Sequence, residues 1–204
     1  DNDNKADIGR WHAATNEFKV RKSSNGSFIT VSLGSSAKSA PGRYYANDSK
    51  TYPAVFNNGT WTIQDNTGGT NHTTITFGQA GDVPMSADYD GDGITDLAII
   101  RPSTNTWWVR QSTNGSIAPY NSGQAGDIPV PGNYDNDSKT DIAIYRPATG
   151  VWTISYSTGG VSSVTWGQAG TDVPVPADYD GDNKTDLAIF RRTTGTWYVV
   201  GSQT

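Results

Sequence analysis

The sequence predicts an all-β fold built from repeated small antiparallel sheets, and three observations predict it. An acidic loop recurs three times at a spacing of 45 residues, with Asp90, Asp135 and Asp180 at equivalent positions. After each loop come short runs in which apolar and polar residues alternate, as they do in strands. Glycine, proline and asparagine separate these runs, and no long stretch has the ~3.6-residue periodicity of a helix. Four short strands in a repeat of about 40–50 residues indicate β-propeller blades, whose faces are buried against neighbouring blades.

We expect each repeat to form one four-stranded antiparallel blade. The first strand starts with an aspartate, an apolar residue and a proline, and the acidic loop leads from it to a second strand of the form Asp-h-Ala-h, where h is apolar. A third strand carries a tryptophan, and the fourth ends in Gly-Gln-Ala-Gly. The tryptophans alternate with aliphatic residues, so we expect all of them in the core. They are Trp61, Trp107, Trp152 and Trp197.

The pattern divides the chain into about four and a half units within a single repeat domain. These units are 1–39, 40–82, 83–127, 128–172 and 173–204. By this pattern the first unit lacks its first strand and the last unit lacks its fourth. We therefore expect the chain to be part of a longer array or to be completed by another chain, because an open sheet edge invites strand addition.

The clustered carboxylates of the loops predict bound calcium. Four carboxylates crowd into residues 88–96 and repel one another unless a cation joins them. Calcium takes six to eight oxygen ligands at roughly 2.3–2.6 Å in flexible geometry. An EF-hand is excluded, because Ile99 stands where that loop needs a bidentate glutamate. Three calcium ions would bring the net charge of −5 close to neutral, so the acidity indicates metal ligands rather than a face for basic partners.

These loops resemble those of the FG-GAP/VCBS-type calcium-binding β-propeller repeats, a group that includes integrin α-subunits and many secreted bacterial proteins. The resemblance covers residues 83–204 well and residues 1–82 loosely, and it implies one ion per acidic loop. The implied ligands are four side chains and the carbonyl of the seventh loop residue: Asp88, Asp90, Asp92, Ile94 (carbonyl) and Asp96; Asn133, Asp135, Asp137, Lys139 (carbonyl) and Asp141; and Asp178, Asp180, Asp182, Lys184 (carbonyl) and Asp186.

A fourth, partial site is expected at the N-terminus, and no ion is expected in the second unit. The N-terminal run matches the last seven loop positions and offers Asp1, Asp3, Lys5 (carbonyl) and Asp7. In the second unit the corresponding run is 44–52, where only Asp48 keeps a carboxylate. We expect that loop to hold its shape by packing.

No motif for catalysis is present, so we expect a protein without catalytic activity of its own. The sequence has no nucleophile elbow, no zinc-protease motif and no glycine loop that would cradle a phosphate. The aspartates are mostly committed to ions, and Glu17 is the only glutamate. No apolar run approaches the ~18 residues of a membrane span, and no basic patch indicates nucleic acid. Few charges and many Asn, Ser and Thr residues favour a secreted, extracellular or cell-surface location, where free calcium is abundant.

Aromatic residues are the best candidates for ligand binding. Flat side chains stack on the apolar faces of sugar rings, and four of them are placed away from the expected core: Trp108, Tyr198, Tyr120 and Trp166. Recurring arginines at 101, 146 and 191 are better read as turn residues that pair with a carboxylate or carbonyl. Glycosylation sequons in polar turns add four further candidates: Asn25, Asn58, Asn71 and Asn114.

We therefore expect a secreted, calcium-stabilised, propeller-type recognition or adhesion module. Its expected partners are glycans or other cell-surface and matrix components. Two alternatives remain open: a structural subunit of an extracellular fibre or oligomer that joins copies through unpaired blade edges, and a non-catalytic appendage of a secreted hydrolase.

Overall fold

The computed structural model describes residues 8–12, 14–32, 37–46, 49–65 and 71–202 of the chain. All regular structure in these residues is β, in five antiparallel sheets of three or four strands each. The predicted all-β class and the propeller type of blade are confirmed.

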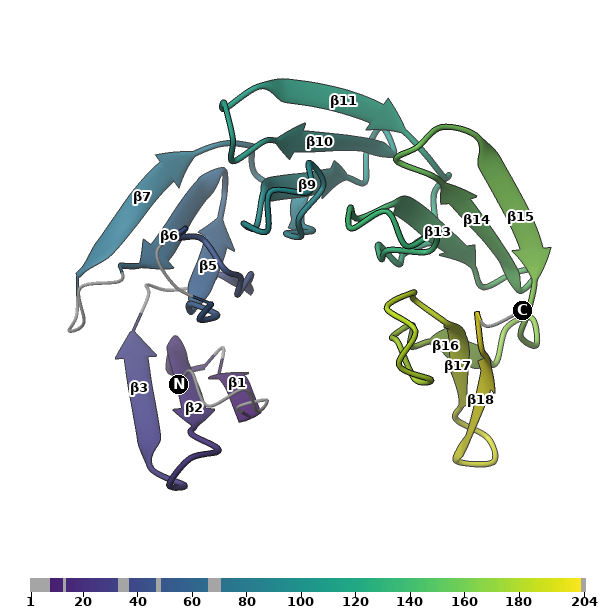
Figure 1. The fold of residues 1–204 in the computed structure, drawn as a ribbon, viewed down its shortest axis with the longest axis horizontal. Helices are drawn as coiled ribbons and strands as arrows, with labels where there is room; N and C mark the ends of the chain where they lie inside the picture. Colours follow the sequence, from purple (N-terminus) through teal and green to yellow (C-terminus); the bar gives the residue numbers. More distant parts are fainter. Residues whose placement is uncertain (1–7, 13, 33–36, 47–48, 66–70, 203–204) are drawn as a thin grey trace. The chain divides into compact units, whose positions relative to one another are not determined.

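The strands follow one another within each sheet in a simple meander (Figure 1). The first sheet contains β1 (Ile8–His12), β2 (Glu17–Arg21) and β3 (Phe28–Ser32). The second contains β4 (Lys38–Ser39), β5 (Ala54–Asn57), β6 (Thr60–Gln64) and β7 (His72–Thr76). The third contains β8 (Val83–Pro84), β9 (Leu97–Arg101), β10 (Thr106–Arg110) and β11 (Ile117–Asn121). The fourth contains β12 (Ile128–Pro129), β13 (Ile142–Arg146), β14 (Val151–Ser155) and β15 (Val161–Thr165). The fifth contains β16 (Asp172–Pro174), β17 (Leu187–Arg191) and β18 (Thr196–Val200).

The chain divides into two compact units. The first unit comprises residues 1–87, 92–101 and 108–118. The second comprises residues 88–91, 102–107 and 119–204, so that the division runs through the third sheet.

Each unit has its own core, in which the repeated tryptophan packs against an aromatic residue of the neighbouring strand. In the first unit, Trp61 lies opposite Phe56 across the β5–β6 pair, with ring centroids 5.1 Å apart. In the second, Trp152 lies opposite Tyr145 across β13–β14, with centroids 5.2 Å apart. Trp61, Trp107 and Trp152 are fully buried, which confirms the expected core position for these three.

The indole N–H groups of Trp61 and Trp152 are bonded to the backbone that follows the fourth strand of the same sheet, whereas the buried indole N–H of Trp107 has no hydrogen-bond partner. Trp61 Nε1 donates to the Phe77 carbonyl at 2.8 Å, and Trp152 Nε1 donates to the Trp166 carbonyl at 2.9 Å. In these two sheets the segment after the fourth strand thus satisfies the polar atom of the tryptophan.

The expected core position is wrong for Trp197. This residue pairs with Phe190 across β17–β18 in the usual way, yet 55% of its surface is exposed. Among the residues that the structure describes, the fifth sheet has only three strands, so no fourth strand covers the Trp197 indole.

Candidate functional site

The acidic loops join the first two strands of their sheets, and their backbone shape explains the alternation of aspartate with small residues. In the second unit, bridges from Gly132 to Asp141 and from Ala177 to Asp186 close the base of each loop. The fourth and sixth residues of these two loops have positive φ, a region that glycine and asparagine enter most readily. They are Asn136 (66°), Ser138 (69°), Gly181 (84°) and Asn183 (67°).

The last aspartate of each of these two loops is buried and accepts two backbone hydrogen bonds. Asp141 is 0% exposed, and its two oxygens accept the amides of Tyr134 and Ser157, both at 2.8 Å. Asp186 is bonded to its two amides in the same way, at 2.8 and 2.7 Å. This aspartate therefore ties the start of the loop to the residue that follows the third strand.

The loop at 133–141 gathers three carboxylates around an unsatisfied oxygen atom. Asp135, Asp137 and Asp141 each present an oxygen within 4.8 Å of the others. Asp135 Oδ2 accepts the Thr158 hydroxyl at 2.7 Å, whereas its Oδ1 is buried without a hydrogen-bond partner. Burial raises the pKa of Asp141, the hydrogen bonds from two amides oppose this shift, and the charges of Asp135 and Asp137 add to it.

A cation would satisfy this oxygen and remove the repulsion between the carboxylates. The donors are hard oxygens from flexible side chains, which is the donor set that calcium prefers. The residues present therefore fit the predicted calcium ion.

The third acidic loop also gathers three aspartates, here from its first, third and last positions: Asp178, Asp180 and Asp186. The ligand set of the first loop, Asp88, Asp90 and Asp96 among them, stays a prediction.

The fifth residue of the first and third loops lies outside these groups of three. Asp182 accepts the Lys184 amide and the Ser202 hydroxyl, both at 2.8 Å, and Asp92 accepts the Ser112 hydroxyl at 2.7 Å. The assignment of Asp92 and Asp182 as ligands stays a prediction, as do the amide oxygen of Asn133 and the carbonyls of Ile94, Lys139 and Lys184. The expected partial site at Asp1, Asp3, Lys5 and Asp7 lies outside the described residues, as does Asp48.

Sequence reasoning missed the serines that bond to the loops. Ser112, Ser157 and Ser202 each follow a third strand, and each donates its hydroxyl to the fifth loop residue. Their spacing of 45 residues equals that of the loops, so the repeat pattern held a signal for them.

In the second sheet, aromatic packing replaces the carboxylates. The bridge between Gly42 and Tyr52 places Tyr52 where the other loops have their buried aspartate. It also places Arg43, rather than Tyr44, at the first loop position, so the run expected at 44–52 starts one residue too late. Tyr52 is 6% exposed, and its ring meets the Tyr45 ring edge-on at 4.9 Å.

At the opposite end of the second strands, the recurring arginines form ion pairs with the aspartates that precede or open the first strands. Arg101 pairs with Asp82, Arg146 with Asp127 and Arg191 with Asp172, at 2.9, 2.9 and 2.8 Å. Each aspartate also accepts the backbone amide of the glutamine in the preceding Gly-Gln-Ala-Gly turn. These arginines therefore have the turn role expected of them, although sequence reasoning did not name the partners.

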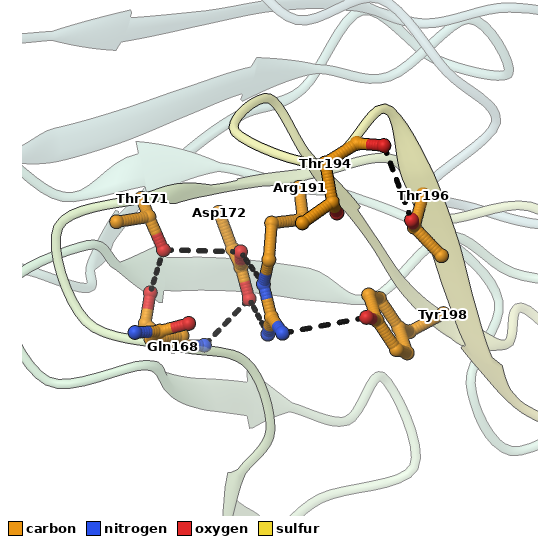
Figure 2. A network of polar contacts seen from close by, with 7 residues as sticks. All are labelled: Gln168, Thr171, Asp172, Arg191, Thr194, Thr196 and Tyr198. Atoms are coloured by element: carbon orange, nitrogen blue, oxygen red, sulfur yellow. Dashed lines mark hydrogen bonds and ion pairs between the residues drawn. The ribbon is translucent and has the colours of Figure 1, made fainter.

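Around Arg191 this polar network reaches an aromatic ring (Figure 2). The guanidinium lies between the Asp172 carboxylate and Tyr198, and its centre is 4.6 Å from the ring centroid of Tyr198. Arg191 Nη1 is 3.4 Å from the Tyr198 hydroxyl, to which it donates.

The structure brings two of the four candidate aromatic residues into one cavity. A cavity of about 460 Å³ in the second unit is lined by Trp166 and Tyr198, together with Gln168 and Arg191. The Trp166 indole nitrogen is buried and has no hydrogen-bond partner. The other two candidates lie elsewhere: Trp108 is half-buried beneath Arg101, 5.9 Å from its guanidinium, and Tyr120 is 45% exposed on β11.

A buried tyrosine hydroxyl lies behind the wall of this cavity. Tyr145 is 0% exposed, and its hydroxyl has no hydrogen-bond partner. A Cβ atom added at Gly167, a lining residue, would come within 2.9 Å of that hydroxyl. Glycine at 167, with φ of 114°, thus leaves the Tyr145 hydroxyl close to the cavity.

The four sequon asparagines are in or beside turns. Asn25 and Asn114 accept the amides of Ser27 and Ser116, at 2.9 and 2.7 Å. Asn58 has a φ of 49° between β5 and β6, and Asn71 is exposed next to β7.

Comparisons with solved structures show a shared fold. The chain is similar to a virginiamycin B lyase from Staphylococcus aureus, with 12% identity and a TM-score of 0.62 over 97% of this chain and 67% of that one. It is also similar to a streptogramin B lyase, with 14% identity and a TM-score of 0.63 over 98% of this chain and 66% of that one. The chain thus spans about two thirds of the length of these proteins, and at such identities the likeness concerns the fold alone.

No curated protein matches this sequence. Among the described residues, none forms a helix with the length and apolar character that crossing a membrane requires. Residues 88–144, which contain the first two complete acidic loops, match the FG-GAP-like repeat family.

Proposed function

We propose that this chain is a secreted, calcium-stabilised recognition module that binds carbohydrate and has no catalytic activity of its own. The observation that carries the proposal is the cavity of about 460 Å³ that contains Trp166 and Tyr198. Sugar rings have apolar faces that stack on aromatic side chains, and hydroxyl groups that need hydrogen-bond partners.

The polar atoms of this cavity suit a neutral, hydroxyl-rich ligand. The Arg191 guanidinium is already neutralised by Asp172, so the cavity carries little net charge. The buried indole nitrogen of Trp166 is an unused donor, and Gln168 adds an exposed amide at the rim. Stacking would supply most of the affinity, and these donors would select among sugars.

A glycan array probed in millimolar calcium tests this proposal. We expect Trp166→Ala and Tyr198→Ala to lower the affinity for any bound glycan about tenfold or more, because both remove stacking area. Tyr120→Ala is the matched control, since it removes an exposed aromatic residue that does not line the cavity. A blank array across plant, fungal and animal sugars would refute the proposal, as would equal losses in all three variants.

Self-association is a second candidate function, favoured by the exposed apolar surface of β18. Trp197, Val199 and Val200 are 55%, 42% and 40% exposed, and β18 is an edge strand of the described fifth sheet. Two copies of the chain would pair these edges around a two-fold axis, as isologous interfaces do.

Sedimentation velocity over a range of protein concentrations tests the second candidate. We expect dimers that Trp197→Lys abolishes, because a charge on this face would have to be buried in the pair. Val161→Lys is the control, as it changes a residue that is 68% exposed on β15 of the fourth sheet. A protein that remains monomeric at high concentration rules out this function.

A further inference from the structure

A second cavity lies in the first unit, and nothing in the proposed function uses it. Its volume is about 180 Å³, and all its lining residues belong to that unit. Apolar side chains from the second and third sheets form much of its wall: Ile63 on β6, Ile75 on β7 and Leu97 on β9. At about 30 Å³ for each water of the bulk liquid, the space corresponds to roughly six waters, which is room for a small ring.

The cavity contains a hydroxyl group that no protein atom satisfies. The Tyr45 hydroxyl is buried without a hydrogen-bond partner, although Tyr45 itself lines the cavity. The edge contact with Tyr52 fixes the Tyr45 ring, so the hydroxyl has a defined position. A buried polar atom of this kind stays costly unless a ligand or water pairs with it.

The cavity also contains an uncommitted cation. Arg110 at the end of β10 lines the cavity, and within the described part of the chain its guanidinium makes no hydrogen bond or ion pair. Arg101, on β9 of the same sheet, is instead held by Asp82 at 2.9 Å. Arg110 is thus available for an anion, and guanidinium binds carboxylate through two parallel hydrogen bonds.

The neighbouring acidic groups are already engaged. No carboxylate is among the lining residues, and the acidic loop at 88–96 touches the cavity through Ile94 and Thr95, next to Ser112 from the turn after β10. Ser112 donates its hydroxyl to Asp92 and its backbone amide to Asp96, both at 2.7 Å. The lining therefore offers one positive charge, one free hydroxyl and an apolar wall.

We propose that this cavity binds a small molecule with an apolar ring and one carboxylate, which pairs with Arg110 and the Tyr45 hydroxyl. A free organic acid and the terminal acidic sugar of a glycan both offer a carboxylate on a ring, and the sugar presents the C–H face of its ring to the apolar wall. The cavity is separate from the one at Trp166 and Tyr198, so neither proposal depends on the other.

Titration calorimetry and amide chemical-shift mapping of the full chain in calcium buffer test the proposal. The probes are cyclohexanecarboxylate, its uncharged carboxamide, and glucuronate. We expect one or both carboxylates to bind, with shifts at Leu97 and Ser112 and none at Gly167 and Gln168. The carboxamide should bind at least about tenfold more weakly, since it lacks the charge. Tighter binding of glucuronate points to an acidic glycan, and tighter binding of cyclohexanecarboxylate points to a free acid.

Matched variants locate the binding. Arg110→Gln should weaken carboxylate binding about tenfold or more, whereas Arg192→Gln, an exposed change of the same charge in the second unit, should leave it unchanged. Tyr45→Phe keeps the ring contact and should weaken binding a few-fold. Arg110→Lys, which keeps the charge, should restore part of the affinity and shows that a loss in Arg110→Gln is not a folding defect. No binding by either carboxylate, or equal binding by Arg110→Gln and Arg192→Gln, would overturn the proposal.

Discussion

At the scale of single residues, the structure assigns paired roles to side chains that the sequence shows only as recurring. Asp172 has both oxygens committed: they accept two nitrogens of Arg191, at 2.8 and 2.9 Å, and the Gln168 amide at 2.6 Å. The Arg191 side chain is the main cause that lowers the pKa of Asp172 to about 2. The turn before the fifth sheet thus depends on one ionised carboxylate (Figure 2).

We predict that Asp172 makes folding sensitive to acid. Its folded pKa is lower than its unfolded value of about 3.9, so its contribution to stability is present above pH ~4 and is lost as the pH falls toward 2. Asp172→Asn should lower the melting temperature at pH 7 by about 3–8 °C, and should flatten the pH dependence between pH 4 and 2. Thermal unfolding followed by circular dichroism at several pH values measures both effects.

The control for this prediction is Glu17→Gln. Glu17 makes a surface pair with Lys19 at 3.5 Å and accepts the Thr15 hydroxyl at 3.0 Å in an exposed turn, and such surface contacts contribute little to stability. If Asp172→Asn shifted the melting curve no more than Glu17→Gln does, the ion pair with Arg191 would not be stabilising.

At the scale of elements, the acidic loop is a turn whose shape is set by the backbone and whose charge is left unbalanced. Buried Asp141 holds the base of its loop through two amides, and positive φ at Asn136 and Ser138 bends the chain around the carboxylates. Asp135, whose Oδ1 has no partner, is one of three carboxylates that lie close together in this loop. These three carboxylates could hold a metal ion.

We predict that one substitution in a loop removes one ion. Asp135→Asn keeps the size of the side chain but removes a charge from the group of three, and it should lower the calcium content by one ion per chain. Asp182→Ala should do the same in the third loop, because it removes a predicted ligand. It also removes the hydrogen bond to Ser202. Native mass spectrometry in calcium gives the count. Asp48→Ala is the control and should change nothing; an equal count in all three variants contradicts the site assignment.

Most of the loops and strands could be predicted from the sequence. A repeat of 45 residues shows that the same loop recurs between the same kinds of strand. The acidic loops, the short strands and the buried Trp152 follow from spacing and alternation. The first position of the loop in the second sheet does not follow from them, since Arg43 offers no carboxylate to align and a one-residue insertion hides the register. The core position predicted for Trp197 was wrong. The alternation of apolar and polar residues indicates on which face of the strand a side chain lies, whereas the burial of that face depends on a fourth strand. The cavity at Trp166 and Tyr198 joins residues of two sheets, which no local pattern reveals.

At the scale of the whole molecule, we expect each repeated loop to make a similar contribution to the free energy of unfolding. Each described sheet is small, and each acidic loop fixes the connection between its first two strands. The unfolded chain has no preformed site, so ion binding would add directly to the free energy of unfolding. If all three loops bind calcium as proposed, the stability of the domain depends on the calcium concentration.

We predict that calcium raises the melting temperature by on the order of 10 °C or more relative to EDTA. Extracellular modules bind calcium with Kd values down to about 10⁻⁴ M, and at 100 times Kd each site contributes about 2.7 kcal/mol. For a domain of this size each kcal/mol corresponds to a shift of about 2–4 °C. Differential scanning calorimetry from micromolar to 10 mM calcium measures the shift. Magnesium is the control: it demands near-ideal octahedral geometry and gives up water reluctantly, so it should stabilise the protein less. Identical melting curves in EDTA and in calcium would show that the acidic loops hold their shape without an ion.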